Sequence, residues 1–271
     1  MSINHILPFL STTIMLVFTI YVLQRYAVRR APHFLFWGIG LAMFGAGSFA
    51  EAYLALAWSP VVFFIWYLFG AALNAAWIGH GTLYLLVRKK WVHGVTIVLV
   101  LGSLYAGYLM LREMPRLDTA VFKTDKMISE QYGTKVLEGN EVPTGALTAT
   151  TIYRGQEVTV VRGLLPLGAP VRLTTPFFNI YGLLTLVGGA IWSGFLFWRK
   201  RVLPNRVIGN VLIAAGALLI GSASTLTRLG YGQFLYIGEL LSAILMFAGF
   251  RIAARPQQDE VPQAIPVMGA D

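Results

Sequence analysis

The chain has 271 residues, of which 56% are hydrophobic and only 12% are charged, and its mean hydropathy is +0.66. A soluble domain carries about 25% charged residues, so half of that proportion leaves too few charges to coat a water-facing globule. The absence of cysteine excludes disulfides, thiolate metal sites, haem thioethers and thiol nucleophiles. The net charge of +9 is compatible with nucleic-acid binding, but the positions of the basic residues favour a membrane surface instead.

Seven apolar runs predict transmembrane helices, because roughly 20 apolar residues span the hydrocarbon core of a bilayer as a helix. We place them at residues 5–25, 33–56, 60–87, 93–111, 177–198, 206–227 and 232–252. The first run has no charged segment before it, and Arg25, Arg29 and Arg30 follow it in place of a cleavage signal. We therefore interpret it as a retained first helix. The expected fold is an all-α integral membrane protein, a seven-transmembrane-helix bundle.

The short connections between these runs alternate in charge. Loops 26–32, 88–92 and 199–205 carry arginine or lysine and no acid, whereas the turns 58–60 and 230–232 carry no charge. The positive-inside rule then places the N-terminus outside and the C-terminus in the cytoplasm of a cell (plasma or inner) membrane. Anionic lipid headgroups suffice as partners for the basic loops, and we expect no nucleic-acid partner.

Segment 112–176, between the fourth and fifth helices, differs from the rest in composition. It contains eight basic and seven acidic residues, and its alternation from Leu147 to Val161 predicts two short strands around the turn 153–156. We expect a small β-rich extracytoplasmic cap. The predicted organisation is 1–111 (helices 1–4), 112–176 (cap), 177–254 (helices 5–7) and 255–271 (a disordered cytoplasmic tail).

Helices 1–3 and 5–7 share a layout of span, basic loop with a proline, second span, short outer turn and third span. A single shift aligns Arg30 with Arg201 and Gly45 with Gly216. Both triplets begin outside, so a true duplication would give a 3+1+3 plan of parallel repeats, which certain small carriers use. Because apolar helices share residues by chance, coincidence is the alternative explanation.

Charged side chains in the outer half of the predicted bundle form the first candidate site. Glu51 and Glu239 each lie about two turns below the outer end of their helices, and Arg228, Thr225 and Ser222 lie near the outer end of the sixth helix. Buried charges in a bilayer are costly and often functional. The pattern indicates a polar ligand-binding crevice beneath the cap, or a structural ion pair. We expect Arg228 to contact at least one of the two acids.

A polar and aromatic stripe on the third helix is the second candidate site. Tyr67, Asn74 and Trp77 share roughly one helical face. They could line a ligand pocket with one amide group, or they could serve interhelical packing and hydrogen bonding.

Most enzyme and cofactor chemistries lack their residues. Every lysine lies in a predicted loop, so a retinal Schiff base has no attachment point inside the bundle. No aspartate lies in a span, and the histidines His33, His80 and His93 have neither metal-ligand spacing nor an accompanying acid. We therefore expect hydrogen-bonded or interfacial histidines, no catalytic residues, no metal and no cofactor.

Two hypotheses for function follow. The first is a non-enzymatic ligand- or partner-binding membrane protein, either a sensor or an accessory subunit of a membrane complex, with its polar crevice in the outer half. The second is a small 3+1+3 carrier for a small solute. Small residues recur at four-residue intervals on several helices, and we assign them to close helix packing, which includes possible self-association. A membrane-protein partner or a homo-oligomer is possible.

Overall fold

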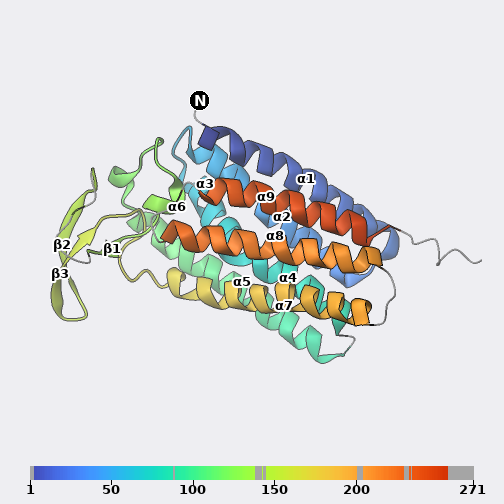
Figure 1. Cartoon of the computed structure of the whole chain (residues 1–271). Coiled ribbons are helices and arrows are strands. Elements are labelled where there is room, and N and C mark those ends of the chain that lie inside the picture. Colours follow the sequence, from blue (N-terminus) through green and yellow to red (C-terminus); the bar gives the residue numbers. More distant parts are fainter. Residues whose placement is uncertain are drawn as a thin grey trace, which may run out of the picture.

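The computed structural model describes residues 3–87, 89–137, 142, 145–199, 204–228, 232 and 234–255. Within these residues, seven helices are long and apolar enough to cross a membrane, which is the number that the sequence predicts. They run side by side, as Figure 1 shows, and indicate a membrane-embedded, multi-pass protein. Six of the seven spans are α1 (Ile3–Arg29), α2 (Pro32–Leu54), α5 (Trp91–Glu113), α7 (Val171–Arg199), α8 (Pro204–Arg228) and α9 (Phe234–Ala253).

The third span consists of three consecutive helical segments. These are α3 (Pro60–Ile65), the π-helix η1 (Trp66–Leu73) and α4 (Asn74–Leu86). Proline at the first turn favours the start of α3, and the Ser59 hydroxyl accepts a bond from the backbone N–H of Val62 at 3.4 Å. A π-helical segment inside an α-helix is rare and frequently lies at a functional site.

The observed helix ends agree with the predicted spans to within a few residues, except at the start of α7. The sequence places this start at residue 177, directly after Pro176. The structure begins the helix at Val171 and keeps Pro176 inside it. The predicted tail 255–271 lies outside the described residues, apart from Arg255.

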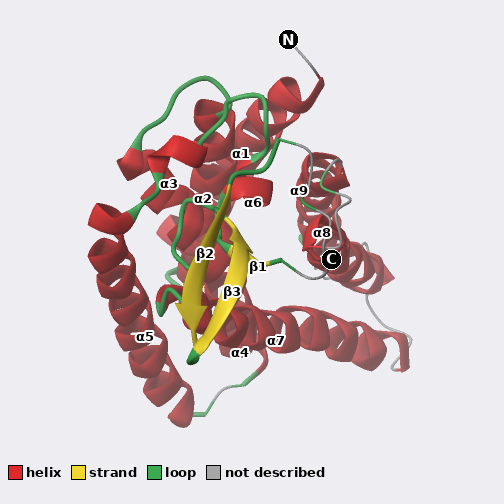
Figure 2. Ribbon diagram, turned by 90° about the vertical axis from the view of Figure 1, so that its left-hand side faces the viewer, coloured by secondary structure: helices red, strands yellow, loops and turns green. Residues whose placement is uncertain are grey.

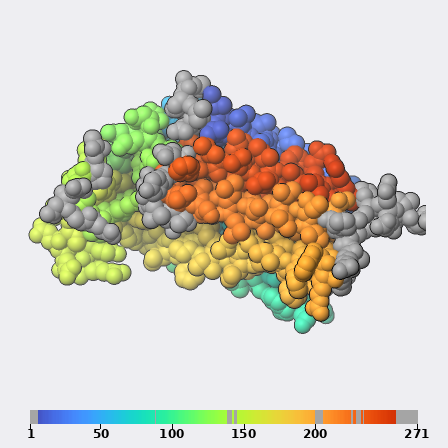
Figure 3. All heavy atoms as spheres, in the orientation of Figure 1, coloured from blue at the N-terminus to red at the C-terminus, as the bar shows by residue number. Residues whose placement is uncertain are grey.

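Six spans pack as a closed series of neighbours. Going round the series, α1 packs on α2, α2 on α4, α4 on α7, α7 on α8, α8 on α9, and α9 on α1. Helix α5 has few contacts with this series, which it makes with α4, η1 and α7, and it lies at the flank of the bundle in Figure 2. Seen from the side in Figure 3, the side chains of α8 and α9 cover much of one face of the molecule.

The cap lies at one end of the helices (Figure 1). Its short helical turns are η2 (Met114–Arg116), η3 (Thr119–Val121) and α6 (Ile128–Gln131), and its strands are β1 (Lys135–Val136), β2 (Thr148–Tyr153) and β3 (Gln156–Val161). The strands form an antiparallel sheet in the order β1-β3-β2. Arg154 and Gly155 both have positive φ, 53° and 81°, as a two-residue type I′ hairpin requires. The predicted hairpin is therefore confirmed.

The base of the cap contacts the third span through aromatic rings, and an ion pair joins two segments of the cap. The ring of Tyr132 packs against Trp66 and Tyr67, with centroids 5.5 and 6.1 Å apart. Arg162 donates two bonds to Asp118, at 2.7 and 2.8 Å. We call this end of the bundle the cap end, and the opposite end, where Arg29, Arg206 and Arg255 lie, the arginine end.

Candidate functional site

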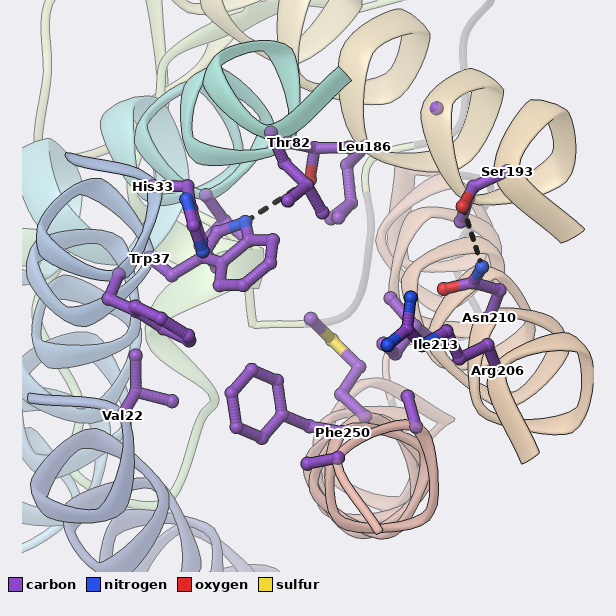
Figure 4. A pocket seen from close by; sticks show the side chains of 18 of the residues that line it. Val22, His33, Trp37, Thr82, Leu186, Ser193, Arg206, Asn210, Ile213 and Phe250 are labelled. Atoms are coloured by element: carbon purple, nitrogen blue, oxygen red, sulfur yellow. Dashed lines mark hydrogen bonds between the residues drawn. The ribbon is translucent and has the colours of Figure 1, made fainter. Parts of the chain in front are cut away.

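A cavity of about 890 Å³ lies among α1, α2, α4, α7, α8 and α9 and reaches the arginine end. Figure 4 shows labelled side chains from several of these helices around a shared space. Its apolar wall includes Phe18, Val22, Phe34, Trp37, Leu41, Ile78, Leu186, Met246 and Phe250. Its basic residues are Arg25, Arg29, His33, Arg206 and Arg255. Among the described residues of the lining there is no aspartate or glutamate.

Aromatic rings hold two of the cavity arginines. The Arg25 guanidinium lies over the ring of Tyr21, 5.0 Å from its centroid, and donates a bond to the Tyr21 hydroxyl at 2.9 Å. It also lies 5.8 Å from the centroid of Phe250. The Arg206 guanidinium lies 5.5 Å from the ring centroid of Phe197. Cation–π contacts position the two guanidinium groups at the cavity without removing their charge.

Two hydrogen bonds fix polar groups on opposite walls of the cavity (Figure 4). On one wall, the indole N–H of Trp37 donates to the Thr82 hydroxyl at 3.2 Å. On the other, the Asn210 amide donates to the Ser193 hydroxyl at 2.9 Å. The cavity therefore combines an apolar, aromatic interior with a few oriented polar groups and a cluster of cations.

The two acids of the first predicted site meet inside the bundle. Glu51 on α2 and Glu239 on α9 are 3% and 9% exposed, and their carboxyl groups lie close enough to interact with each other. The indole N–H of Trp66 donates to Oε1 of Glu51 at 2.8 Å. Two carboxyl groups this close repel each other when both are ionised, so a shared proton or a bound cation would relieve the repulsion.

Of the remaining residues of the first predicted site, only Ser222 has a described side chain. Ser222 lies on the exposed surface of α8. The side chains of Arg228 and Thr225 lie outside the described residues, so the predicted contact of Arg228 with an acid stays a prediction. The acids themselves are enclosed rather than set in an open crevice.

The stripe on the third span contacts three different partners. The Tyr67 hydroxyl bonds to Thr175 of α7 at 3.1 Å. The Asn74 amide donates to the carbonyl of Gly70 at 2.7 Å, and the Trp77 indole donates to the Ser103 hydroxyl of α5 at 3.1 Å. These contacts are those expected from the packing alternative. A ligand-binding role for Tyr67, Asn74 and Trp77 stays a prediction.

His80 is hydrogen-bonded at both ring nitrogens. Its Nδ1 lies 2.7 Å from the Tyr181 hydroxyl and its Nε2 lies 2.8 Å from the Thr96 hydroxyl. Across the described residues, no group of three or more histidines and acids is placed to hold a metal ion. His80 thus joins α4, α5 and α7 through neutral side chains.

Sequence reasoning missed the cavity, because it assigned the basic residues of the arginine end to lipid headgroups. One signal was present on the first helix. Phe18, Val22, Arg25 and Arg29 recur at three- and four-residue intervals and so form one stripe. A stripe that passes from aromatic to cationic along one face is typical of an amphipathic binding wall. Which helices complete the wall cannot be read from one sequence.

Comparison of this chain with protein-family models, with curated proteins and with solved structures found no match. The interpretation of its sites therefore depends on the geometry and chemistry of its own residues.

Proposed function

We propose that the protein is a non-enzymatic membrane protein that binds a small amphipathic anion in the cavity at its arginine end. The observation that carries this proposal is the composition of the lining: among its described residues it has four arginines, a histidine and no acid, around an aromatic and aliphatic interior. A group of cations around a partly buried space attracts an anionic group, and guanidinium groups suit carboxylate and phosphate oxygens.

The size and depth of the cavity favour a ligand with an apolar body. Ligand pockets typically measure about 300–1,000 Å³ and are mainly apolar with a few placed polar groups. The cavity, at about 890 Å³, falls in this range. An acyl, isoprenoid or aromatic body would contact Phe18, Trp37 and Phe250, while its charged head would contact Arg25 and Arg29. The proposed ligand site therefore lies at the opposite end of the bundle from the crevice that the sequence predicts.

The orientation in the membrane follows from the basic loops. With the arginine end in the cytoplasm, the cap and the N-terminus lie outside a cell membrane. The anion would then enter from the cytoplasm or from the inner leaflet.

A carrier of 3+1+3 plan is the second candidate, and the order of helix neighbours favours it. The contacts α1–α2, α2–α4 and α4–α7 recur in the second half as α7–α8, α8–α9 and α9–α1. This equivalence is what two parallel triplets related by an axis along the membrane normal would produce, with α5 as the linker. The cavity lies between the triplets, and the Glu51–Glu239 contact closes the bundle nearer the cap end.

Binding can be tested with two probes that share an apolar body and differ in charge, octyl phosphate and octylammonium. The protein in nanodiscs of zwitterionic lipid should be stabilised against heat by octyl phosphate and not by octylammonium. Arg29→Gln should weaken octyl phosphate binding by about tenfold, as loss of a charge-assisted bond implies. Arg251, which is exposed at the same end and does not line the cavity, supplies the control Arg251→Gln.

Equal stabilisation by both probes, or equal loss in Arg29→Gln and Arg251→Gln, would show that binding does not use the cavity charge. Nanodiscs with and without anionic lipid separate a headgroup from a soluble anion, since a lipid occupant would compete with the probe. Counterflow of the bound anion in liposomes distinguishes the carrier from a protein that only binds.

A further inference from the structure

Among the described residues, four of the buried side-chain oxygens without a hydrogen-bond partner lie on α1, α2 and α9 in the cap-side half of the bundle. They are Ser11 Oγ, Ser48 Oγ, Glu51 Oε2 and Glu239 Oε2. All four residues are at least nine-tenths buried. Because buried polar atoms are nearly always satisfied by protein, water or an ion, this group of oxygens indicates a site that a ligand completes.

The two serines lie at the same level of α1 and α2. A Cβ placed on Gly45 of α2 would lie 3.3 Å from the Cβ of Met15 on α1, which fixes the register of this antiparallel pair. Ser11 lies one turn from Met15 toward the cap end, and Ser48 lies about one turn from Gly45 in the same direction. Met15 and Ser11 are both fully buried and four residues apart, so they share the inward face of α1.

The same level on α9 holds Glu239. Leu7 of α1 packs against the cluster that contains Tyr236 of α9. Both helices run from the cap end toward the arginine end. Ser11 lies one turn beyond Leu7 on α1, and Glu239 lies about one turn beyond Tyr236 on α9. Ser11 and Glu239 therefore lie at similar levels of two neighbouring helices.

Glu51 completes this arrangement from α2, because its carboxyl group lies beside that of Glu239 and it is three residues from Ser48. The ion pairs of the described residues include neither acid. Two adjacent carboxyl groups without a described cationic partner would be stabilised by a cation bound between them.

We propose that Ser11, Ser48, Glu51 and Glu239 form a binding site for one monovalent cation between α1, α2 and α9. Alkali cations take oxygen ligands, and one positive charge between two adjacent carboxyl groups would offset the repulsion between them. The π-helical segment η1 begins at Trp66, the residue that bonds to Glu51, which places a backbone irregularity of a kind common at functional sites next to the ligands. The cation would hold α2 and α9 together independently of any anion at the arginine end.

The experiment measures binding of ²²Na⁺ to the purified full-length chain in nanodiscs, together with thermal unfolding in sodium chloride and in choline chloride at equal ionic strength. We expect saturable binding of one ion per chain and a higher Tm in sodium. Glu51→Gln and Glu239→Gln should each lower the affinity by about tenfold or more, because even outer-sphere partners of a metal are worth about that much. Ser48→Ala should lower it less.

Glu113→Gln is the matched control, since Glu113 is also 3% exposed and also has an unpartnered Oε2, but lies on α5 outside this arrangement. It should bind sodium as the unsubstituted protein does. If a glutamine variant does not fold, Ser11→Ala and Ser48→Ala test the same site. Absence of sodium binding, dependence on pH alone, or binding unchanged in Glu51→Gln would overturn the proposal. So would sodium binding that appears only in Arg228→Gln, because Arg228 would then occupy the site.

Discussion

A carboxyl group buried between helices depends on the few donors that its neighbours supply. Trp66 is such a donor, at 2.8 Å from Glu51 and itself only 4% exposed. In surroundings of low dielectric, a bond to an ionised or proton-sharing carboxyl is stronger than a bond between neutral groups. The indole also packs against Tyr132 of the cap, so one side chain links the carboxyl pair to the cap.

Substituting Trp66 with phenylalanine removes this donor and keeps an aromatic ring. We expect it to lower the free energy of unfolding by about 1–3 kcal/mol, the cost of leaving a buried charged or polar group without its partner. Trp77→Phe is the control, because it removes an equal volume and one indole bond, but the partner is the neutral hydroxyl of Ser103. Its expected cost is about 0.5–1.5 kcal/mol. Thermal unfolding in nanodiscs compares the two, and a larger loss in Trp77→Phe would contradict this account.

Helices approach each other most closely where small residues face each other. A Cβ on Gly47 of α2 would collide with the Cα of Gly70 in η1, and one on Gly182 of α7 would collide with Ala75 of α4. Such contacts bring backbones together in a membrane, where packing rather than water expulsion drives helix association. The four-residue spacing of small residues in the sequence therefore corresponds here to contacts within the chain.

Gly47→Ala should destabilise the protein by roughly 1–3 kcal/mol, because backbone at Gly70 cannot yield as a flexible side chain would. Gly188→Ala in α7 is the matched control, since a Cβ there meets nothing within 4 Å. In that position alanine should be neutral or stabilising by about 0.5–1 kcal/mol, owing to its higher helix propensity. Thermal unfolding of both variants measures the sign of the change in stability. A Gly47→Ala variant as stable as the unsubstituted protein would mean that α2 and η1 are further apart than described.

Elements defined by local pattern could be predicted, and relations between elements could not. Hydropathy located seven spans, and the turn at Arg154 and Gly155 with its flanking alternation located the hairpin. The contact between Glu51 and Glu239 joins residues far apart in the chain, so only the packing of α1, α2 and α9 reveals it. The cavity is lined by six helices, and their packing cannot be read from one sequence. Its arginines were therefore interpreted as interfacial residues.

At the scale of the whole molecule, charge and hydrogen bonding are distributed unequally along the bundle axis. Cations gather around the cavity at the arginine end, whereas unpartnered oxygens gather nearer the cap end. At the cap end, Tyr132 of the cap packs in one apolar cluster with Trp58 and Trp66 of the bundle. An anion and a cation would thus bind at different depths of one bundle, with α2 and α9 contributing to both sites.

The orientation of this axis in the membrane can be tested with single introduced cysteines, because the chain has none of its own. Ile152 is 77% exposed on the hairpin, and Lys90 is exposed in a basic loop at the opposite end. The positive-inside rule predicts that a membrane-impermeant maleimide labels Ile152→Cys in intact cells and labels Lys90→Cys only after permeabilisation. Thr134 would be a poor position in the cap, since it is 7% exposed and bonded to Gly163. Labelling of Lys90→Cys alone in intact cells would reverse the orientation and place the mouth of the anion cavity outside.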